Sequence, residues 1–491
     1  MNTPITCDQR GCGQGKTTGT IYKQINQNLL DQINTLLVVP SILLQQQYSA
    51  AYPNACIINS LLDQLSTQKQ LIAHTQNNQP LIIITHATFC MIATTSGYKN
   101  RYSLIIDEAI ANIVDHVQYD YVANPRWQYD MQFAQLFALA GGHMAAATIK
   151  ADPLCTTHYY QLQLRVTNPE DFAFSDSRVY KKLCDTNRTI FVTAANWHNL
   201  TNNTSSKNTL IRELNPQIMQ GWHSVLIAAA NFVRTPMYAW LTKHLFQITT
   251  LPGCLFEQHR ACISWYSEQT LGAVIPDPAG AEATTQNWSA TLRRAHPHIL
   301  SNWHAHINKI MQGAPILSLR NNDEMAARAG AIANELVLSH NMHGENKYQA
   351  YLNVNCESTL NLVPDVKRFI IYRWLSDQDA IEQKRAIAHY THAYLFYQLI
   401  MRTHARSRDY QQQQINFFCL DQDICTAVMD YFDIDPKNFS HVALDCLVPP
   451  PKRLGRPNGT TRLTPAQKKE NRRLLNQKKY LERKEKKKQN K

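Results

Sequence analysis

The sequence lacks several features that would place it in a simple class. No Cys-x-x-Cys pair occurs among its 12 cysteines, and no cysteine and histidine cluster has zinc-finger spacing. Cysteines scattered in this way along 491 residues are typical of reduced thiols. No apolar run approaches the roughly 20 residues needed to span a bilayer, and the N-terminus is polar. Because the thiols are expected to be reduced and no segment is long enough to span a bilayer, we expect a soluble cytoplasmic protein. No repeat of fixed period occurs either.

Length and charge indicate several domains and one basic segment. The chain exceeds the roughly 250–300 residues at which a single core stops growing, so two or three domains are expected. The net charge of +12 is unevenly distributed, because residues 452–491 hold 16 Lys and Arg against 3 Asp and Glu. The remaining chain has 33 basic and 34 acidic residues and is almost neutral. This distribution predicts a tethered basic arm rather than a basic body.

The basic arm has features of a nucleic-acid-binding tail. It follows three prolines, 449–451, that mark a stiff linker. Lys452, Arg453 and Arg456 belong to a partial AT-hook core, whose extended backbone would enter the minor groove. The charged segment 464–488 has little to bury and is expected to stay disordered until it meets a polyanion. We expect salt-sensitive binding without sequence preference, with a solubilising tail as the alternative.

Strands alternate with helices in two stretches of the chain, which predicts an α/β fold with parallel sheets. The apolar runs are continuous, as expected for strands covered on both faces. In the first stretch, strands are expected at 36–39, 81–85 and 103–106. An irregular insertion is expected at about 115–187, after which strands at 189–192 and 224–228 resume the pattern. In the second stretch, strands are expected at 315–319, 352–354, 368–372 and 415–420, and helices at 324–338 and 377–402.

A glycine-rich loop precedes the first helix and predicts a phosphate-binding site. Residues 10–18 read Arg-Gly-Cys-Gly-Gln-Gly-Lys-Thr-Thr. The backbone N–H groups of such a loop surround a phosphate, and the helix that follows directs its positive end toward it. Lys16 would reach the β- and γ-phosphates, although Arg10 stands where a small residue is usual. The nucleotide-binding residues that we predict are Gly13, Gln14, Gly15, Lys16, Thr17 and Thr18.

An apolar strand that ends in two acids predicts the hydrolytic partner of this loop. Leu104–Ile106 is followed by Asp107 and Glu108, about ninety residues after the loop. We expect Asp107 and the Thr17 hydroxyl to hold Mg²⁺, and Glu108 to orient or deprotonate the attacking water. ATP and Mg²⁺ are therefore the expected cofactors.

In this order the elements resemble superfamily 2 helicases of the DEAD/DEAH type, and most closely the helicase-like proteins of phages and bacterial mobile elements. The resemblance spans about residues 5–425 and implies two RecA-like lobes, with ATP between them and nucleic acid across both. It implies that Pro40 and Ser41, and likewise Thr85 and His86, contact the nucleic-acid backbone. The sequence departs from the DEAD signature at Ile110, which excludes the true DEAD-box group.

The segment that couples the two lobes has two candidates under this resemblance, Thr193–Asn196 and Ala229–Asn231. We favour the second, because Phe232 and a following helix continue the family pattern. In the second lobe, the segment 343–348 resembles a motif that senses nucleotide and nucleic acid together.

The last motif resembles the arginine-finger helix of the family. Gln398, Arg402 and Arg406 are spaced four residues apart, so that a helix would present them on one face. The resemblance implies that they act on the nucleotide from the second lobe. Together with Lys16, Asp107 and Glu108 they form the predicted catalytic set.

These interpretations predict a first lobe at 1–245, a connecting region at 246–312, a second lobe at 313–448 and a tail at 449–491. We expect an ATP-dependent helicase or translocase that acts on nucleic acid, DNA in preference to RNA, in phage or plasmid replication. The alternative is a DNA-binding initiator or scaffold with a regulatory or decayed nucleotide site. A packaging ATPase would also require a nuclease carboxylate cluster, and we find none in the sequence.

Overall fold

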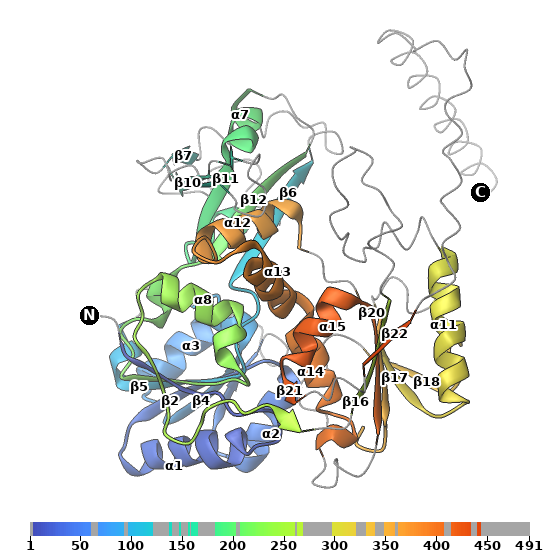
Figure 1. The fold of residues 1–491 in the computed structure, drawn as a ribbon. Coiled ribbons are helices and arrows are strands. Elements are labelled where there is room, and N and C mark those ends of the chain that lie inside the picture. Colours follow the sequence, from blue (N-terminus) through green and yellow to red (C-terminus); the bar gives the residue numbers. More distant parts are fainter. Residues whose placement is uncertain are drawn as a thin grey trace, which may run out of the picture. The chain divides into compact units, whose positions relative to one another are not determined.

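The structure is a computed structural model (Figure 1). It describes residues 3–442 apart from 60–66, 93–96, 121–136, 140–146, 149–155, 158, 165–181, 203–206, 261–262, 269–296, 321–329, 339–347, 359–361, 407–413 and 434–438. The two lobes and the insertion described below belong to one compact unit, Met1–Leu444. Within the described ranges, none of the helices combines the length and the apolar character that crossing a bilayer requires.

The first lobe is built on a seven-stranded sheet in which all the pairings are parallel. Its strands, in spatial order, are β14 (Ile248–Thr250), β1 (Ile5–Asp8), β13 (Ser224–Ala228), β5 (Tyr102–Asp107), β2 (Asn34–Val39), β4 (Leu81–Thr85) and β3 (Cys56–Ile58). The sheet therefore places one strand, β13, between the strand before the glycine-rich loop and the strand that ends at Asp107.

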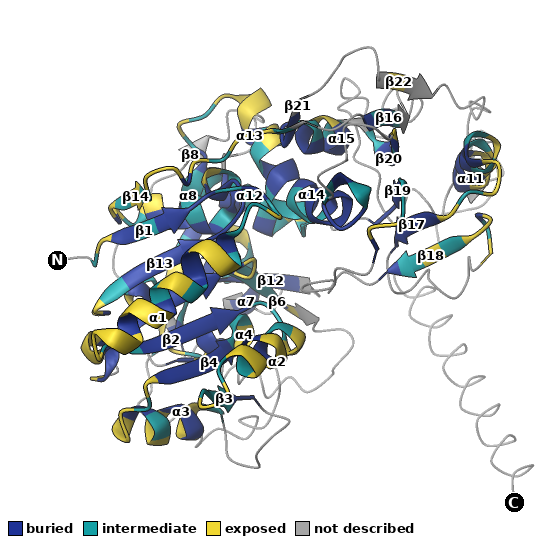
Figure 2. Ribbon diagram, turned by 90° about the horizontal axis from the view of Figure 1, so that it is seen from below, coloured by how far each residue is buried: buried dark blue, intermediate teal, exposed yellow. Residues whose placement is uncertain are grey.

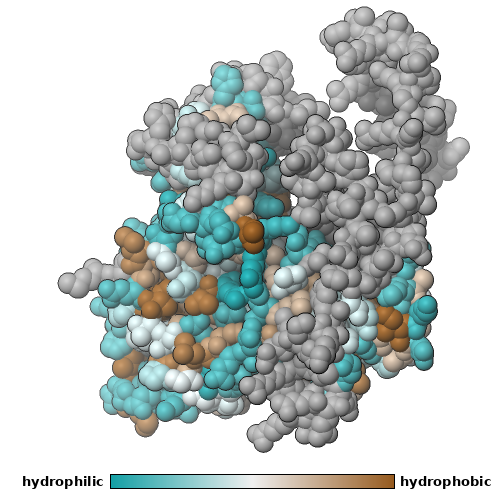
Figure 3. Space-filling model, in the orientation of Figure 1, coloured by the Kyte–Doolittle hydropathy of each residue, from teal (hydrophilic) through white to brown (hydrophobic). Residues whose placement is uncertain are grey.

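Helices cover both faces of this sheet, which explains its unbroken apolar strands. Alternate residues of β2 point to opposite faces of the sheet and belong to two different cores. Leu37 lies in the core shared with α1 (Tyr22–Leu30) and α2 (Ile42–Ala51). Leu36 lies in the core shared with α3 (Thr67–Gln76) and α8 (Pro236–Lys243). Figure 2 shows the strands buried and the outer faces of α1 and α3 exposed. Hydrophobic residues on the face drawn in Figure 3 lie in small groups among hydrophilic ones.

The second lobe has a six-stranded sheet whose pairings are also all parallel. Its strands, in order, are β18 (Glu335–Leu338), β17 (Ile316–Leu319), β19 (Asn353–Cys356), β20 (Ile415–Asp421), β16 (Ile263–Glu268) and β22 (Phe439–Val442). The helices described in this part of the chain are α11 (Pro297–Met311), α12 (Pro364–Trp374), α13 (Ala380–Ala388), α14 (Tyr394–Ile400) and α15 (Gln422–Met429). Two parallel sheets flanked by helices confirm the predicted fold class of two RecA-like lobes.

The insertion is larger than predicted and forms an antiparallel sheet of its own. Its strands, in order, are β6 (Val114–Asp120), β12 (Lys207–Leu214), β11 (Arg188–Thr193), β10 (Tyr159–Leu164) and β7 (Phe137–Leu139). The expected return to the αβ pattern at 189–192 is therefore wrong. Short apolar segments occur in parallel and antiparallel sheets alike, so the local sequence does not show which sheet such a strand joins. Its pairing partners, which are distant in sequence, decide this.

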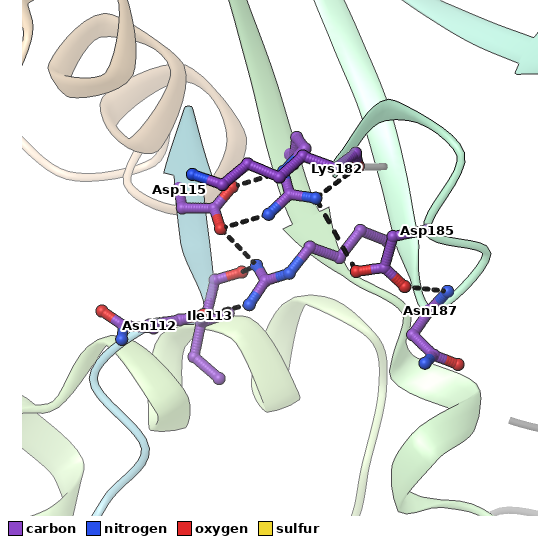
Figure 4. A network of polar contacts seen from close by, with 8 residues as sticks. Asn112, Ile113, Asp115, Lys182, Asp185 and Asn187 are labelled. Atoms are coloured by element: carbon purple, nitrogen blue, oxygen red, sulfur yellow. Dashed lines mark hydrogen bonds and ion pairs between the residues drawn. The ribbon is translucent and has the colours of Figure 1, made fainter. Parts of the chain in front are cut away.

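An ion-pair network fastens the base of the insertion (Figure 4). The Asp115 carboxylate accepts hydrogen bonds from Nε and Nη2 of Arg212 at 2.7 and 2.6 Å, and lies 3.8 Å from Nη1 of Arg188. Arg188 also donates to the backbone oxygens of Asn112 and Ile113 at 2.9 and 3.3 Å. These contacts join β6, β11 and β12 where the chain leaves and re-enters the first lobe.

Three further expectations require correction. The strand predicted at 368–372 is part of helix α12, where Val366, Phe369 and Ile370 are buried at helical spacing after Pro364. Residues 335–338, expected to end a helix, form strand β18 beside β17. The range 246–312, expected to connect the lobes, instead supplies β14 to the first sheet and β16 to the second.

Candidate nucleotide site

The glycine-rich loop is curled around the side chain of Lys16. Its ammonium donates to the backbone oxygens of Arg10 at 2.8 Å and Gly11 at 3.0 Å. Gly13 and Gly15 adopt φ of 81° and 80°, a left-handed conformation that glycine reaches without strain. Successive turns of this kind direct backbone N–H groups into a concavity that suits an anion. The left-handed glycines are compatible with the predicted phosphate-binding loop, and its role toward a phosphate stays a prediction.

Arg10, which stands where the usual pattern has a small residue, closes the base of this loop. It donates from Nε and Nη2 to Asp8 at 3.0 and 2.6 Å, and from Nη2 to the Thr20 hydroxyl at 2.7 Å. Burial raises the pKa of Asp8, but its hydrogen bonds with Arg10 and Thr20 outweigh burial and lower the pKa below its ordinary value. The arginine therefore joins the end of β1 to the helical turn after the loop.

The two residues predicted to hold Mg²⁺, Asp107 and Thr17, both interact with the phenol of Tyr48. Tyr48 donates to Oδ2 of Asp107 at 2.8 Å, and the same phenol interacts with the Thr17 hydroxyl. Burial and the neighbouring Glu108 raise the pKa of Asp107 above its ordinary value. Because Mg²⁺ in phosphate sites takes one or two protein ligands together with phosphate oxygens and water, Asp107 and Thr17 fit such an ion.

Glu108 has an unusual backbone conformation beside this pair. Its φ is 67°, in the left-handed region that costs a non-glycine residue about 1–3 kcal/mol. The Glu108 N–H donates to the Ala228 carbonyl of β13 at 3.0 Å, which helps to hold this turn. Its carboxylate accepts hydrogen bonds from two residues of the second lobe, the Tyr394 hydroxyl and, at 3.1 Å, the Gln398 amide.

The structure brings Gln398 to Glu108 and Arg406 to the glycine-rich loop, but Gln398, Arg402 and Arg406 do not lie on one continuous helix. Helix α14 ends at Ile400, and the chain continues through tighter turns in which Arg402 N–H donates to the Leu399 carbonyl at 3.0 Å. Arg406 reaches the loop itself, since its Cγ lies 3.2 Å from the place where a Cβ on Gly13 would stand.

Arg402 is buried, with 9% of its surface exposed, and its charge acts on the loop. Burial raises the pKa of the Cys12 thiol, while the positive charges of Lys16 and Arg402 both oppose this rise. The charge of Arg402, from the second lobe, therefore influences the same thiol as the charge of Lys16 in the first lobe. Their roles toward a nucleotide stay predictions.

Tyr397 joins α14 to the glycine-rich loop, a contact that the sequence did not reveal. The Cys12 N–H donates to its hydroxyl at 2.8 Å, and the hydroxyl lies 2.8 Å from Nε2 of His259. Burial lowers the pKa of His259 to about 4, so the neutral ring can accept a hydrogen bond from the phenol. A Cβ on Gly11 would collide with this Nε2, so only glycine fits there.

An ion pair connects the lobes next to the favoured coupling segment. Arg234, from the turn after Ala229–Asn231, lies 2.5 Å from Oδ2 of Asp430 in the second lobe. Arg385, from the second lobe, binds the same carboxylate, with its Nε 2.6 Å from Oδ2. We call Arg234, Arg385 and Asp430 the interlobe clasp.

The two candidate coupling segments lie in different places. Thr193–Asn196 belongs to the insertion, where the Asn196 side chain donates to the Thr209 carbonyl at 3.2 Å. Ala229–Asn231 lies between the lobes: Ala229 N–H donates to the Asp8 carbonyl at 3.0 Å, and Ala230 packs into the core of the second lobe. This position suits the second candidate.

The residues predicted to contact nucleic acid lie at the edge of the first sheet where β2 and β4 end. Pro40 follows β2, and the hydroxyls of Ser41 and Thr85 accept hydrogen bonds from N–H groups of α2 and α4 (His86–Phe89) as N-caps. His86 Nε2 lies 2.9 Å from the Asp107 carbonyl oxygen, so this edge adjoins the two acids. The predicted motif residues 343–347, and Lys452, Arg453 and Arg456 of the tail, lie outside the described residues.

Comparisons with known proteins give structural similarity only. No family model and no curated protein matches the sequence. Among solved structures, S. tokodaii Xpd4 matches with 11% identity and a TM-score of 0.43, over 90% of this chain and 96% of that one. S. cerevisiae Dbp5 bound to RNA and ADP BeF3 matches with 10% identity and a TM-score of 0.36, over 90% and 86%. The DEAD-box helicase Mss116 bound to ssRNA and UDP-BeF matches with 9% identity and a TM-score of 0.29, over 89% and 76%.

Proposed function

We propose that this chain is an ATP-dependent nucleic-acid motor, a helicase or translocase in which both lobes act on one ATP. The observation that carries the proposal is that side chains of the second lobe contact both halves of the candidate site. Tyr397 and Arg406 meet the glycine-rich loop, and Gln398 meets Glu108. A site divided between two lobes links the state of the nucleotide to the position of the lobes.

The residues then take distinct parts in hydrolysis. The loop amides and Lys16 bind the phosphates, and Glu108 accepts a proton from the attacking water. Mg²⁺, held by Thr17 and Asp107, would neutralise phosphate charge when it is bound. Arg402 stabilises the charge that develops on the γ-phosphate, with Gln398 and Arg406 holding the second lobe against the site.

Nucleic acid is the proposed partner, bound along the edge formed by Pro40, Ser41, Thr85 and His86 and held by the basic arm. The partial AT-hook core of the arm favours DNA over RNA, because the minor groove that it would enter belongs to B-form DNA. The resemblance to proteins of phages and mobile elements points to replication of such an element.

The proposed function is tested by measuring ATP hydrolysis with single-stranded DNA, duplex DNA and RNA in parallel. The wild-type chain should hydrolyse ATP faster with at least one of these, and Lys16→Ala should remove the activity because it removes the phosphate-binding ammonium. Equal rates for wild type and Lys16→Ala would contradict the motor and favour a DNA-binding initiator or scaffold.

Removing residues 452–491 should weaken DNA binding without abolishing the basal ATPase. The slope of log K against log salt should become shallower by roughly 0.9 for every DNA phosphate that the arm neutralises. Binding isotherms at several salt concentrations measure this slope. An unaltered slope would show that the arm is not what binds DNA.

Breaking the interlobe clasp should uncouple the lobes. Arg234→Ala should lower the stimulation of ATPase by nucleic acid about fivefold or more, the range typical of coupling between sites. Arg385→Ala is the matched control, because it removes a charge from the same carboxylate without breaking the link between lobes. Turnover with and without nucleic acid gives the comparison, and equal effects of the two variants would contradict a coupling role.

A further inference from the structure

Two hydrogen-bond donors from one helix engage the same oxygen of Glu108. The Tyr394 hydroxyl and the Gln398 amide both donate to Oε2, the amide at 3.1 Å. Tyr394 begins α14 and Gln398 lies four residues later, so both side chains emerge on the same face of the helix. The second lobe thus supplies two donors to one oxygen of a carboxylate that belongs to the first lobe.

This arrangement gives the two carboxylate oxygens of Glu108 different roles. A carboxylate can accept about four hydrogen bonds, two on each oxygen. With Oε2 satisfied by the two donors, Oε1 is the oxygen left to accept a proton from water. A general base must be held in hydrogen-bond reach of the proton that it removes, so fixing Oε2 also fixes the direction of Oε1.

Tyr394 also makes this orientation depend on the second lobe. Glu108 belongs to the turn after β5 in the first lobe, whereas Tyr394 belongs to the second. If the lobes separate, the phenol leaves the carboxylate, and only the strained backbone at φ 67° positions the glutamate. The base is therefore oriented only when α14 lies against the first lobe.

We propose that Tyr394 is a positioning residue that orients Glu108 for hydrolysis. This inference rests on the proposed ATPase and adds a residue outside the predicted catalytic set. Tyr394→Phe removes the hydroxyl and keeps the ring. A hydrogen bond to a charged group is strong enough that its loss should lower kcat about 10- to 100-fold, while ATP affinity stays unchanged because the loop is intact.

Tyr390→Phe is the matched control. It removes a hydroxyl four residues earlier on the same helical segment, from a ring that packs on Trp374 with 6.5 Å between centroids. Its kcat should equal that of the wild type. If Tyr394→Phe and Tyr390→Phe behave alike while the wild type hydrolyses ATP, this inference fails and the proposed function stands.

A double-mutant cycle distinguishes positioning from a structural role. Because Tyr394 acts through Glu108, adding Tyr394→Phe to Glu108→Gln should lower single-turnover hydrolysis by less than about twofold. If Tyr394→Phe lowers hydrolysis in Glu108→Gln by the same factor as in the wild type, the inference is overturned, because Tyr394 would then act on another group. A wild-type chain whose hydrolysis equals that of Lys16→Ala would end both the inference and the proposed function.

Discussion

Glu108→Gln should bind ATP as tightly as the wild type and hydrolyse it about 10²- to 10⁴-fold more slowly, the usual contribution of a general base. The amide keeps the length of the side chain and can still accept hydrogen bonds from Tyr394 and Gln398 through its oxygen. It cannot take a proton from water. Binding should be unaffected because the phosphates are held by the glycine-rich loop and Lys16. Equilibrium binding of a fluorescent ATP analogue and steady-state turnover measure the two quantities.

The control for this variant is Glu257→Gln, which neutralises an exposed carboxylate on the segment leading to His259. Its turnover should match that of the wild type. If Glu108→Gln also hydrolyses ATP at the wild-type rate, Glu108 is not the group that activates water.

Arg402→Ala should lower kcat by about 10³-fold or more, as expected for an arginine that stabilises the transferred phosphoryl group. The KM for ATP should change far less, because such an interaction is made mainly in the transition state. The kcat of Arg402→Lys should lie between those of the wild type and Arg402→Ala, because an ammonium keeps the charge but loses the planar pair of donors.

Arg402 is buried, so its removal also tests whether the second lobe stays folded. Thermal unfolding of each variant separates this effect from catalysis. A variant with a wild-type melting temperature and wild-type kcat would contradict the role of Arg402. A rise in KM with kcat unchanged would contradict it as well, because it would indicate ground-state binding alone.

The parallel sheets could be predicted because their signals are local. The runs that form β2, β4 and β5 are short, apolar and bounded by polar residues, and the loop from Arg10 to Thr18 has a composition that few other structures require. Asp107 and Glu108 could be placed beside the loop because the loop and the acidic pair each stand at the carboxyl end of a strand. In a parallel sheet these ends share one edge.

The insertion could not be predicted because its pairings are distant in sequence. Val117 in β6 pairs with Leu210 in β12, and nothing near either residue specifies the other. The prediction of a strand within α12 is wrong because the apolar run Phe369–Tyr372 favours a strand locally. Burial of Val366, Phe369 and Ile370 against neighbouring elements selects a helix instead.

The tyrosines of the site escape prediction for a different reason. Tyr394 and Tyr397 lie within one helical turn of Gln398, and the sequence alone indicates no more than an apolar and aromatic helix around them. The sequence of a helix does not show which residues of the other lobe its face contacts. The two hydroxyls reach Glu108 and the Cys12 N–H in the other lobe.

The most direct test of the account is a structure of the full chain with ADP, aluminium fluoride, Mg²⁺ and single-stranded DNA. Lys16 and Arg402, 386 positions apart in the numbering, should both lie within hydrogen-bond distance of the fluoride that stands for the γ-phosphoryl group. A complex in which Lys16 binds the nucleotide while the Arg402 guanidinium remains remote from it would contradict the account.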